Sequence, residues 1–141
     1  MKGQHTVLRE VFLFALGVAI TSFVVLSFTN VQTASQNLAL RDQMLKVADL
    51  VSGSVVHVAE VGENASIGIE IPEKIAEKIY RIRLGDDRVT VALLDDPAVN
   101  ITKKIFNITS SYVMSGEVIS TGRFFEVTTE NRNIRIRRAL G

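Results

Sequence analysis

The stretch from Val11 to Thr29 contains no charged residue, and it constrains the fold more than any other part of the chain. Its apolar side chains fall on every side of a helix, whereas a helix that covers a soluble core has a single apolar stripe. As a helix, residues 11–28 would rise about 27 Å, close to the roughly 30 Å hydrocarbon thickness of a bilayer. We therefore predict one membrane-inserted helix over residues 11–29.

The charges before this span predict its orientation. Lys2 and Arg9 precede it, and the first acidic residue is Glu10. Short basic flanks of a membrane helix tend to stay in the cytoplasm. We expect a cytoplasmic N-terminus, and we expect the residues after Asn30 to be extracellular, at the cell surface.

The rest of the chain has balanced charge and no cysteine. The chain has 16 Lys/Arg and 15 Asp/Glu; without Lys2, Arg9 and Glu10, 14 of each remain beyond residue 29. This balance argues against nucleic acid as a partner. An exported domain without disulfides must be stable through its own core or through neighbours in an assembly.

Residues 34–61 continue at helical spacing, but with one apolar side. The apolar positions recur at steps of three, four and seven residues: Leu38, Leu45, Ala48, Val51, Val55 and Val58. Gly62 is a natural end for a helix. We predict a single helix over residues 4–61 whose amphipathic part, 34–61, packs against the remaining chain. His57 lies beside the stripe and is expected to be partly buried.

From residue 62 onward the apolar period changes from 3.6 to 2. Ile67, Ile69 and Ile71 alternate with small or charged residues, and "GDD" at 85–87 separates two alternating runs, as in a hairpin. Strand-like runs begin near residues 66, 78, 88, 99, 112, 123 and 133, with turn signals at 121–122 and 131. The run "PEKIAEKI" fits either a helical turn or a strand. We predict an α+β fold: a long N-terminal hydrophobic helix, then a small antiparallel β-sheet or β-sandwich domain over 62–141.

Three N-x-S/T sequons, at Asn64, Asn100 and Asn107, follow the predicted span. They lie on the side that the charge pattern places outside the cell, where such sequons accept glycans. Asn100 and Asn107 are seven residues apart and would face opposite sides of one unbroken strand. We therefore expect N-glycosylation of this part of the chain, with a bulge or turn near residues 105–107 or only one of these two as an acceptor.

No catalytic motif is present in the sequence. The carboxylate pairs Asp86-Asp87 and Asp95-Asp96 lack the spacing of a calcium loop and fit solvated turns. His5 and His57 have no partners at zinc-ligand or nucleophile spacing. We therefore expect no enzyme activity, no catalytic residue, no metal and no cofactor.

The C-terminal run "RNIRIRR" carries four arginines: Arg132, Arg135, Arg137 and Arg138. Arg135 and Arg137 would share one face of a strand, and Ile134 and Ile136 the other. On an edge strand such charges oppose edge-to-edge aggregation. The alternative is a contact with an acidic neighbour, a lipid headgroup or an S-layer glycan.

The N-terminus resembles the class III signal peptide of archaeal type IV pilin-like proteins. Lys2-Gly3 resembles the end of the short basic leader, and "QHT" at 4–6 resembles the Gln-x-Ser/Thr start of the mature chain. The resemblance implies a leader at residues 1–3, removed by a prepilin peptidase between Gly3 and Gln4. It further implies a retained helix that polymerises, with the help of pilus assembly machinery, into a homopolymeric filament used for adhesion or surface attachment.

One residue departs from the family pattern. Type IV pilins usually carry a glutamate near the fifth mature position, whereas Glu10 would be the seventh. The resemblance implies that this carboxylate sets helix register by pairing with a neighbouring subunit's amine; the alternative is a pair with Arg9 of the same chain. Its displacement favours a minor or accessory pilin-like protein. The alternatives are a single-pass membrane-anchored surface protein with a β-sandwich binding domain, or an accessory component of a pilus or archaellum machine.

Overall fold

The structure, a computed structural model, describes residues 2–106, 108 and 111–139. It divides into two compact units, an N-terminal helical unit (residues 1–39) and a sheet domain (residues 40–141). The helix α1 (Lys2–Val61) contributes to both units. The other elements are β1 (Ser66–Glu70), β2 (Tyr80–Gly85), β3 (Arg88–Leu93), β4 (Asn100–Lys104), β5 (Val113–Ile119), the 3-10 helix η1 (Ser120–Gly122), β6 (Phe124–Glu130) and β7 (Asn133–Arg138).

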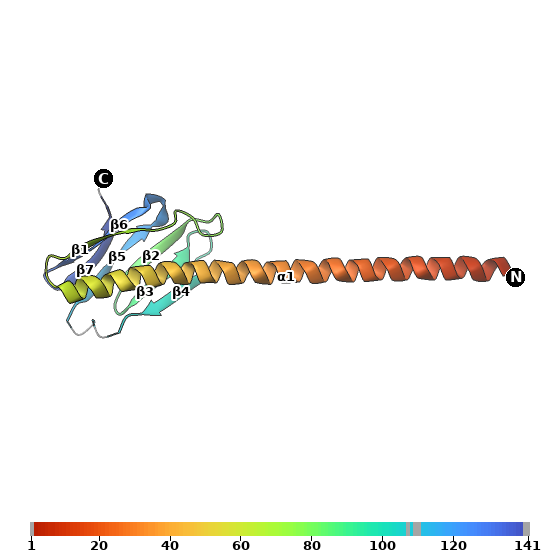
Figure 1. The fold of residues 1–141 in the computed structure, drawn as a ribbon, viewed down its shortest axis with the longest axis horizontal. Coiled ribbons are helices and arrows are strands. Elements are labelled where there is room, and N and C mark those ends of the chain that lie inside the picture. The colour runs from red at the N-terminus through yellow and green to blue at the C-terminus, as the bar shows by residue number, and fades with distance from the viewer. Residues whose placement is uncertain (1, 107, 109–110, 140–141) are drawn as a thin grey trace. The chain divides into compact units, whose positions relative to one another are not determined.

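The seven strands form one mixed sheet in the order β1-β6-β7-β5-β2-β3-β4 (Figure 1). All strand pairs are antiparallel except β5 and β7, which are parallel. The expectation of a purely antiparallel sheet is therefore wrong. The tight β6–β7 turn folds β7 back between β6 and β5, and β7 then runs in the same direction as β5.

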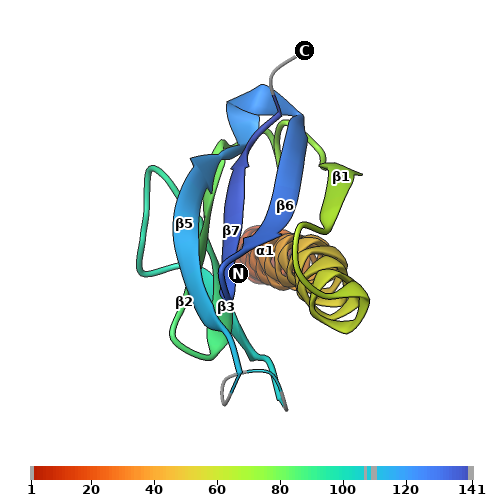
Figure 2. The ribbon, with the colours of Figure 1, turned by 90° about the vertical axis from the view of Figure 1, so that its left-hand side faces the viewer.

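All seven strands of the described chain belong to one sheet, so the β-sandwich alternative, which requires two packed sheets, is also wrong. The part of α1 that belongs to the sheet domain lies along one face of the curved sheet and covers it (Figure 2). The helix buries Met44, Val51, Val55 and Val58, and the sheet buries larger side chains. The largest of these are Tyr80, Phe125, Ile82, Leu84, Leu93 and Ile134. Removing this apolar surface from water is the main stabilisation of the domain.

The predicted stripe is confirmed at four positions, Ala48, Val51, Val55 and Val58, and is wrong nearer the N-terminus. Met44 and Val47 are buried, whereas Leu38 is 72% exposed and Leu45 is 43% exposed. Neighbouring helix positions differ by about 100°, so Leu45 points away from the side on which Met44 and Ala48 meet the sheet. His57, expected to be partly buried, is exposed.

Residues with unusual backbone conformations end the helix and connect the strands. Gly62 follows α1 with a φ of 102°, and its N–H donates to the Val58 carbonyl at 3.1 Å, which ends the helix. Asp86 takes a positive φ in the β2–β3 hairpin, as does Asn131 in the β6–β7 hairpin. Residues 75–78 form a tight turn with a bridge between Ile75 and Lys78, which is neither a helical turn nor a full strand.

The arginine-rich strand β7 lies inside the sheet, between β6 and β5. The edge-strand interpretation of its charges is therefore wrong, because β1 and β4 form the edges. The predicted alternation is confirmed: Ile134 and Ile136 are buried, and Arg135 and Arg137 are exposed. These arginines point from the sheet face opposite the helix.

Candidate assembly helix and sequon positions

The candidate functional segment is the exposed apolar part of α1. Between Gly3 and Ala39 every side chain is exposed except that of Ser27, which is half-buried. Phe14 and Phe28 are exposed at 75% and 76%. By length and composition this helix can cross a membrane, and none of its apolar window is buried in the protein. It could therefore anchor the protein in a membrane or pack against another apolar helix.

Three threonine hydroxyl groups within this segment are satisfied by the helix itself. Thr21, Thr29 and Thr33 each donate to the carbonyl four residues earlier, at 2.8, 3.0 and 3.0 Å. A threonine paired in this way brings little unmet polarity into an apolar environment. The threonines do not oppose burial of the helix in lipid or in a bundle.

The uncharged part of the helix is longer than the predicted span. After Glu10 the next charged residue is Arg41, so residues 30–40 are polar in places but carry no charge. Val31 is 69% exposed within it. The run of strongly apolar residues ends at Thr29, because asparagines and glutamines follow it. The uncharged extension over residues 30–40 can be recognised in the sequence by the separation between Glu10 and the next charged residue, Arg41.

The residues assigned to processing and register lie in the first turns of α1. Gly3, Gln4 and Glu10 are exposed. A Cβ added at Gly3 would meet nothing within 4 Å, so packing in the described chain does not require glycine there. Neither Arg9 nor Glu10 takes part in an ion pair among the described residues. The Glu10 carboxylate is thus available to a partner from another chain.

The sequons occupy separate positions in the sheet domain. Asn64 is exposed in the turn after α1, with a φ of 62°. Asn100 is the exposed first residue of β4, where its amide nitrogen donates to the carbonyls of Pro97 at 3.0 Å and Ala98 at 3.3 Å. Asn107 lies outside the described residues. Because β4 ends at Lys104, Asn100 and Asn107 do not share that strand.

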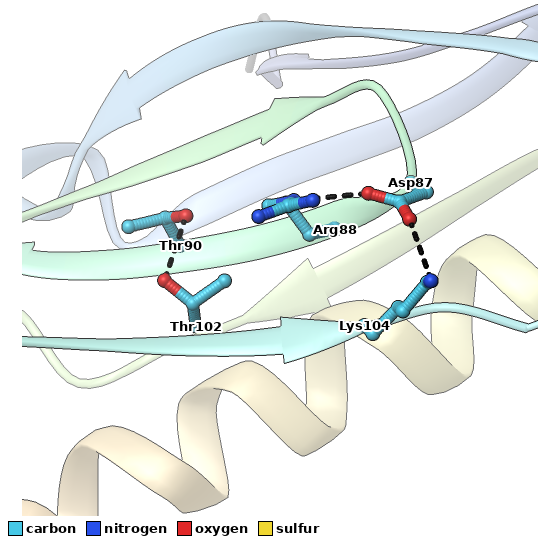
Figure 3. A network of polar contacts seen from close by, with 5 residues as sticks. All are labelled: Asp87, Arg88, Thr90, Thr102 and Lys104. Atoms are coloured by element: carbon cyan, nitrogen blue, oxygen red, sulfur yellow. Dashed lines mark hydrogen bonds and ion pairs between the residues drawn. The ribbon is translucent and has the colours of Figure 1, made fainter.

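The paired carboxylates serve turns and ion pairs. Asp87 accepts from Arg88 Nε at 2.9 Å and pairs with Lys104 Nζ at 3.2 Å (Figure 3). The hydrogen bonds from Arg88 and then Lys104 lower the pKa of the Asp87 carboxyl below its usual value. Asp96 holds the turn before β4 through its backbone carbonyl, which accepts from Val99 at 3.0 Å. Within the described ranges, no three His, Cys, Asp or Glu side chains gather as a metal site would require.

Comparisons with protein-family models, with curated proteins and with solved structures find no match to this chain.

Proposed function

We propose that the chain is a structural subunit of a cell-surface filament of the archaeal type IV pilus kind, which polymerises through its N-terminal helix. The observation that carries the proposal is the helix from Val11 to Ala39, which lacks any charge and whose apolar side chains are uncovered within the chain. The sheet domain has its own core and does not use this segment for its stability. A separate role in assembly explains both facts.

The uncharged extension at residues 30–40 favours a helix bundle over lipid as the final environment. A membrane needs only about 20 apolar residues. Beyond Thr29 the helix enters water in a simple anchor, yet it carries none of the charges found from Arg41 onward. Asparagine, glutamine and threonine side chains form hydrogen bonds between packed helices, where a charge would be costly.

Burial of this helix among copies supplies the assembly free energy. Each 100 Å² of apolar surface removed from water contributes about 2.5 kcal/mol. Because each subunit makes several such helix contacts, the summed free energy favours a polymer that does not dissociate readily. The precursor helix waits in the bilayer with the N-terminus in the cytoplasm until the assembly machinery extracts it.

The first turns of α1 carry the processing and register functions in this proposal. A prepilin peptidase cuts between Gly3 and Gln4, and the Glu10 carboxylate pairs with an amine or guanidinium of a neighbouring subunit. The sheet domains lie outside the helical core, where glycans on Asn64, Asn100 or Asn107 face the medium. Adhesion or surface attachment follows, and no enzyme chemistry is involved.

The rival function is a single-pass anchor or an accessory component of a pilus machine, which the membrane-length segment 11–29 also fits. N-terminal peptide mass spectrometry on membrane and sheared-surface fractions of producing cells separates the two. A filament subunit begins at Gln4 and is enriched in the sheared fraction. An intact Met1 found only in membranes would overturn the filament proposal.

A further inference from the structure

The sheet face turned away from α1, called the outer face below, carries a row of basic and small residues that crosses five strands. The strand registers place its members side by side: Lys104, Arg88, Gly85, Ser115 and Arg135 on β4, β3, β2, β5 and β7. Gly85 and Ser115 occupy the middle of the row, where side chains are absent or short. A depression therefore runs between basic side chains.

This depression, called the trough below, has a volume of about 580 Å³. Its floor includes Gly85 and Ser115, and its walls include Arg83, Arg88 and Thr90. A Cβ at Gly85 would meet nothing within 4 Å, so no neighbouring side chain fills this space. A ligand can approach the sheet backbone closely at this point.

Most carboxylates near the trough form ion pairs with arginine or lysine side chains. Glu117 pairs with Arg81 at 3.2 Å. Asp87 is shared between Arg88 and Lys104, so that cluster keeps one positive charge (Figure 3).

Arg83 and Arg135 are exposed and take part in no ion pair within the described chain. Asp86, at the hairpin tip, is the one lining carboxylate outside the described ion pairs. The lining itself carries two arginines and two carboxylates. At its border Arg135, Arg81 and Lys104 outnumber the single carboxylate of Asp87, so the trough and its border together have an excess of positive charge.

We propose that the trough binds an acidic polysaccharide through the carboxylates of its uronic acid units. Guanidinium groups such as those of Arg83 in the trough and of Arg135, which lies beside Ser115 at its border, bind carboxylates with two parallel hydrogen bonds. The hydroxyls of Thr90 and Thr102 lie 3.3 Å apart beside the trough and, with Ser115, match the hydroxyl groups of a sugar. None of the described residues that line the trough is aromatic, and single-stranded nucleic acids usually require aromatic side chains for base stacking.

This proposal concerns the sheet domain alone and does not depend on polymerisation. The test uses the full chain in detergent micelles and measures its binding to immobilised polygalacturonate, neutral dextran and single-stranded oligothymidine. We expect saturable binding to polygalacturonate that weakens as salt rises, because the charges on this exposed face are screened. Neutral dextran should not bind.

A charge variant tests the arginines. The double substitution Arg83→Gln and Arg135→Gln should weaken polygalacturonate binding by about tenfold or more, since two charge-assisted contacts are lost. Arg41→Gln removes an exposed arginine of α1, away from the outer face, and should leave binding within about twofold.

A steric variant tests the trough itself without changing charge. Gly85→Leu fills the floor and should reduce binding as strongly as the charge variant. Gly68→Leu is the matched control, because Gly68 is exposed on the outer face and, like Gly85, has nothing within 4 Å of an added Cβ. Equal binding by the Gly85 and Gly68 variants, tighter binding to oligothymidine than to polygalacturonate, or no binding to polygalacturonate would each overturn the proposal.

Discussion

At the residue scale, Gly116 is the position least tolerant of a side chain. Its φ is 125°, and a Cβ there would lie 2.6 Å from the backbone oxygen of Ile136 on β7. Gly116→Ala should therefore lower the free energy of unfolding by about 2 kcal/mol or more, because backbone rather than a flexible side chain is in the way. Pulse proteolysis in urea measures the change. Gly85→Ala, where the space is open, should stay within about 0.5 kcal/mol, and equal losses would contradict the argument.

Tyr80 is a buried residue whose ionisation is coupled to folding. It is fully buried, and its hydroxyl donates to the Pro72 carbonyl. Burial raises the pKa of Tyr80 well above its ordinary value. The folded state thus keeps a proton that the unfolded state loses near pH 10. The contribution of this group to stability is complete below pH 10 and is lost as pH rises further.

We expect the urea midpoint to fall above pH 10 more steeply in the wild type than in Tyr80→Phe. The phenylalanine variant should also lose about 1–2 kcal/mol at neutral pH, because the Pro72 carbonyl loses its donor. Tyr112→Phe is the control, since Tyr112 is only half-buried. Identical slopes in the wild type and Tyr80→Phe would refute the coupling.

At the element scale, the face of α1 within the sheet domain separates buried from exposed positions sharply. Val51 is fully buried, whereas its neighbour Leu50 is 44% exposed. Val51→Ala should cost about 2 kcal/mol through lost apolar burial and a residual cavity. Leu50→Ala should change stability by no more than about 0.5 kcal/mol. Both are measured by pulse proteolysis, and a larger loss at Leu50 would mean that another chain covers that side.

The same elements show what the sequence could predict. Strand positions follow from local alternation and from turn residues such as Asp86 and Asn131, so the alternating runs, which predict six or seven strands, coincide with β1 to β7. Strand order depends on contacts between distant residues, and no local pattern in β7 indicates that it lies between β6 and β5. The helix face from Ala48 to Val58 follows from the apolar spacing, whereas Leu45 is apolar but does not meet the sheet, and Met44 is buried in its place.

The candidate site was likewise predicted only in part. Residues 11–29 were found because apolar side chains without charge are an unambiguous local signal. The extension over 30–40 was missed, because amide side chains lower hydropathy although they carry no charge. The trough could not be predicted, since Arg83, Arg88 and Ser115 come from three strands, and no single strand sequence indicates which strands pair with it.

At the scale of the whole molecule, an anchor and a filament subunit differ in what surrounds residues 30–40. In an anchor this stretch lies in water, where added charges are harmless. In a filament it lies among other helices, where an unpaired charge costs several kcal/mol. The double substitution Thr33→Glu and Ser35→Glu places two charges on nearly opposite sides of the helix. Acidic residues contribute little to membrane topology, so insertion of the precursor should be unchanged.

We expect this variant to remain in the membrane fraction at wild-type levels and to be lost from the sheared-surface fraction. The matched control is Gln43→Glu with His57→Glu, which adds the same charge at two exposed positions of α1 within the sheet domain. The control should still reach the sheared fraction, because those positions lie beyond the uncharged helix. Equal amounts of both variants in sheared material would show that residues 30–40 are in water. The helix would then act as an anchor or pack only through residues 11–29.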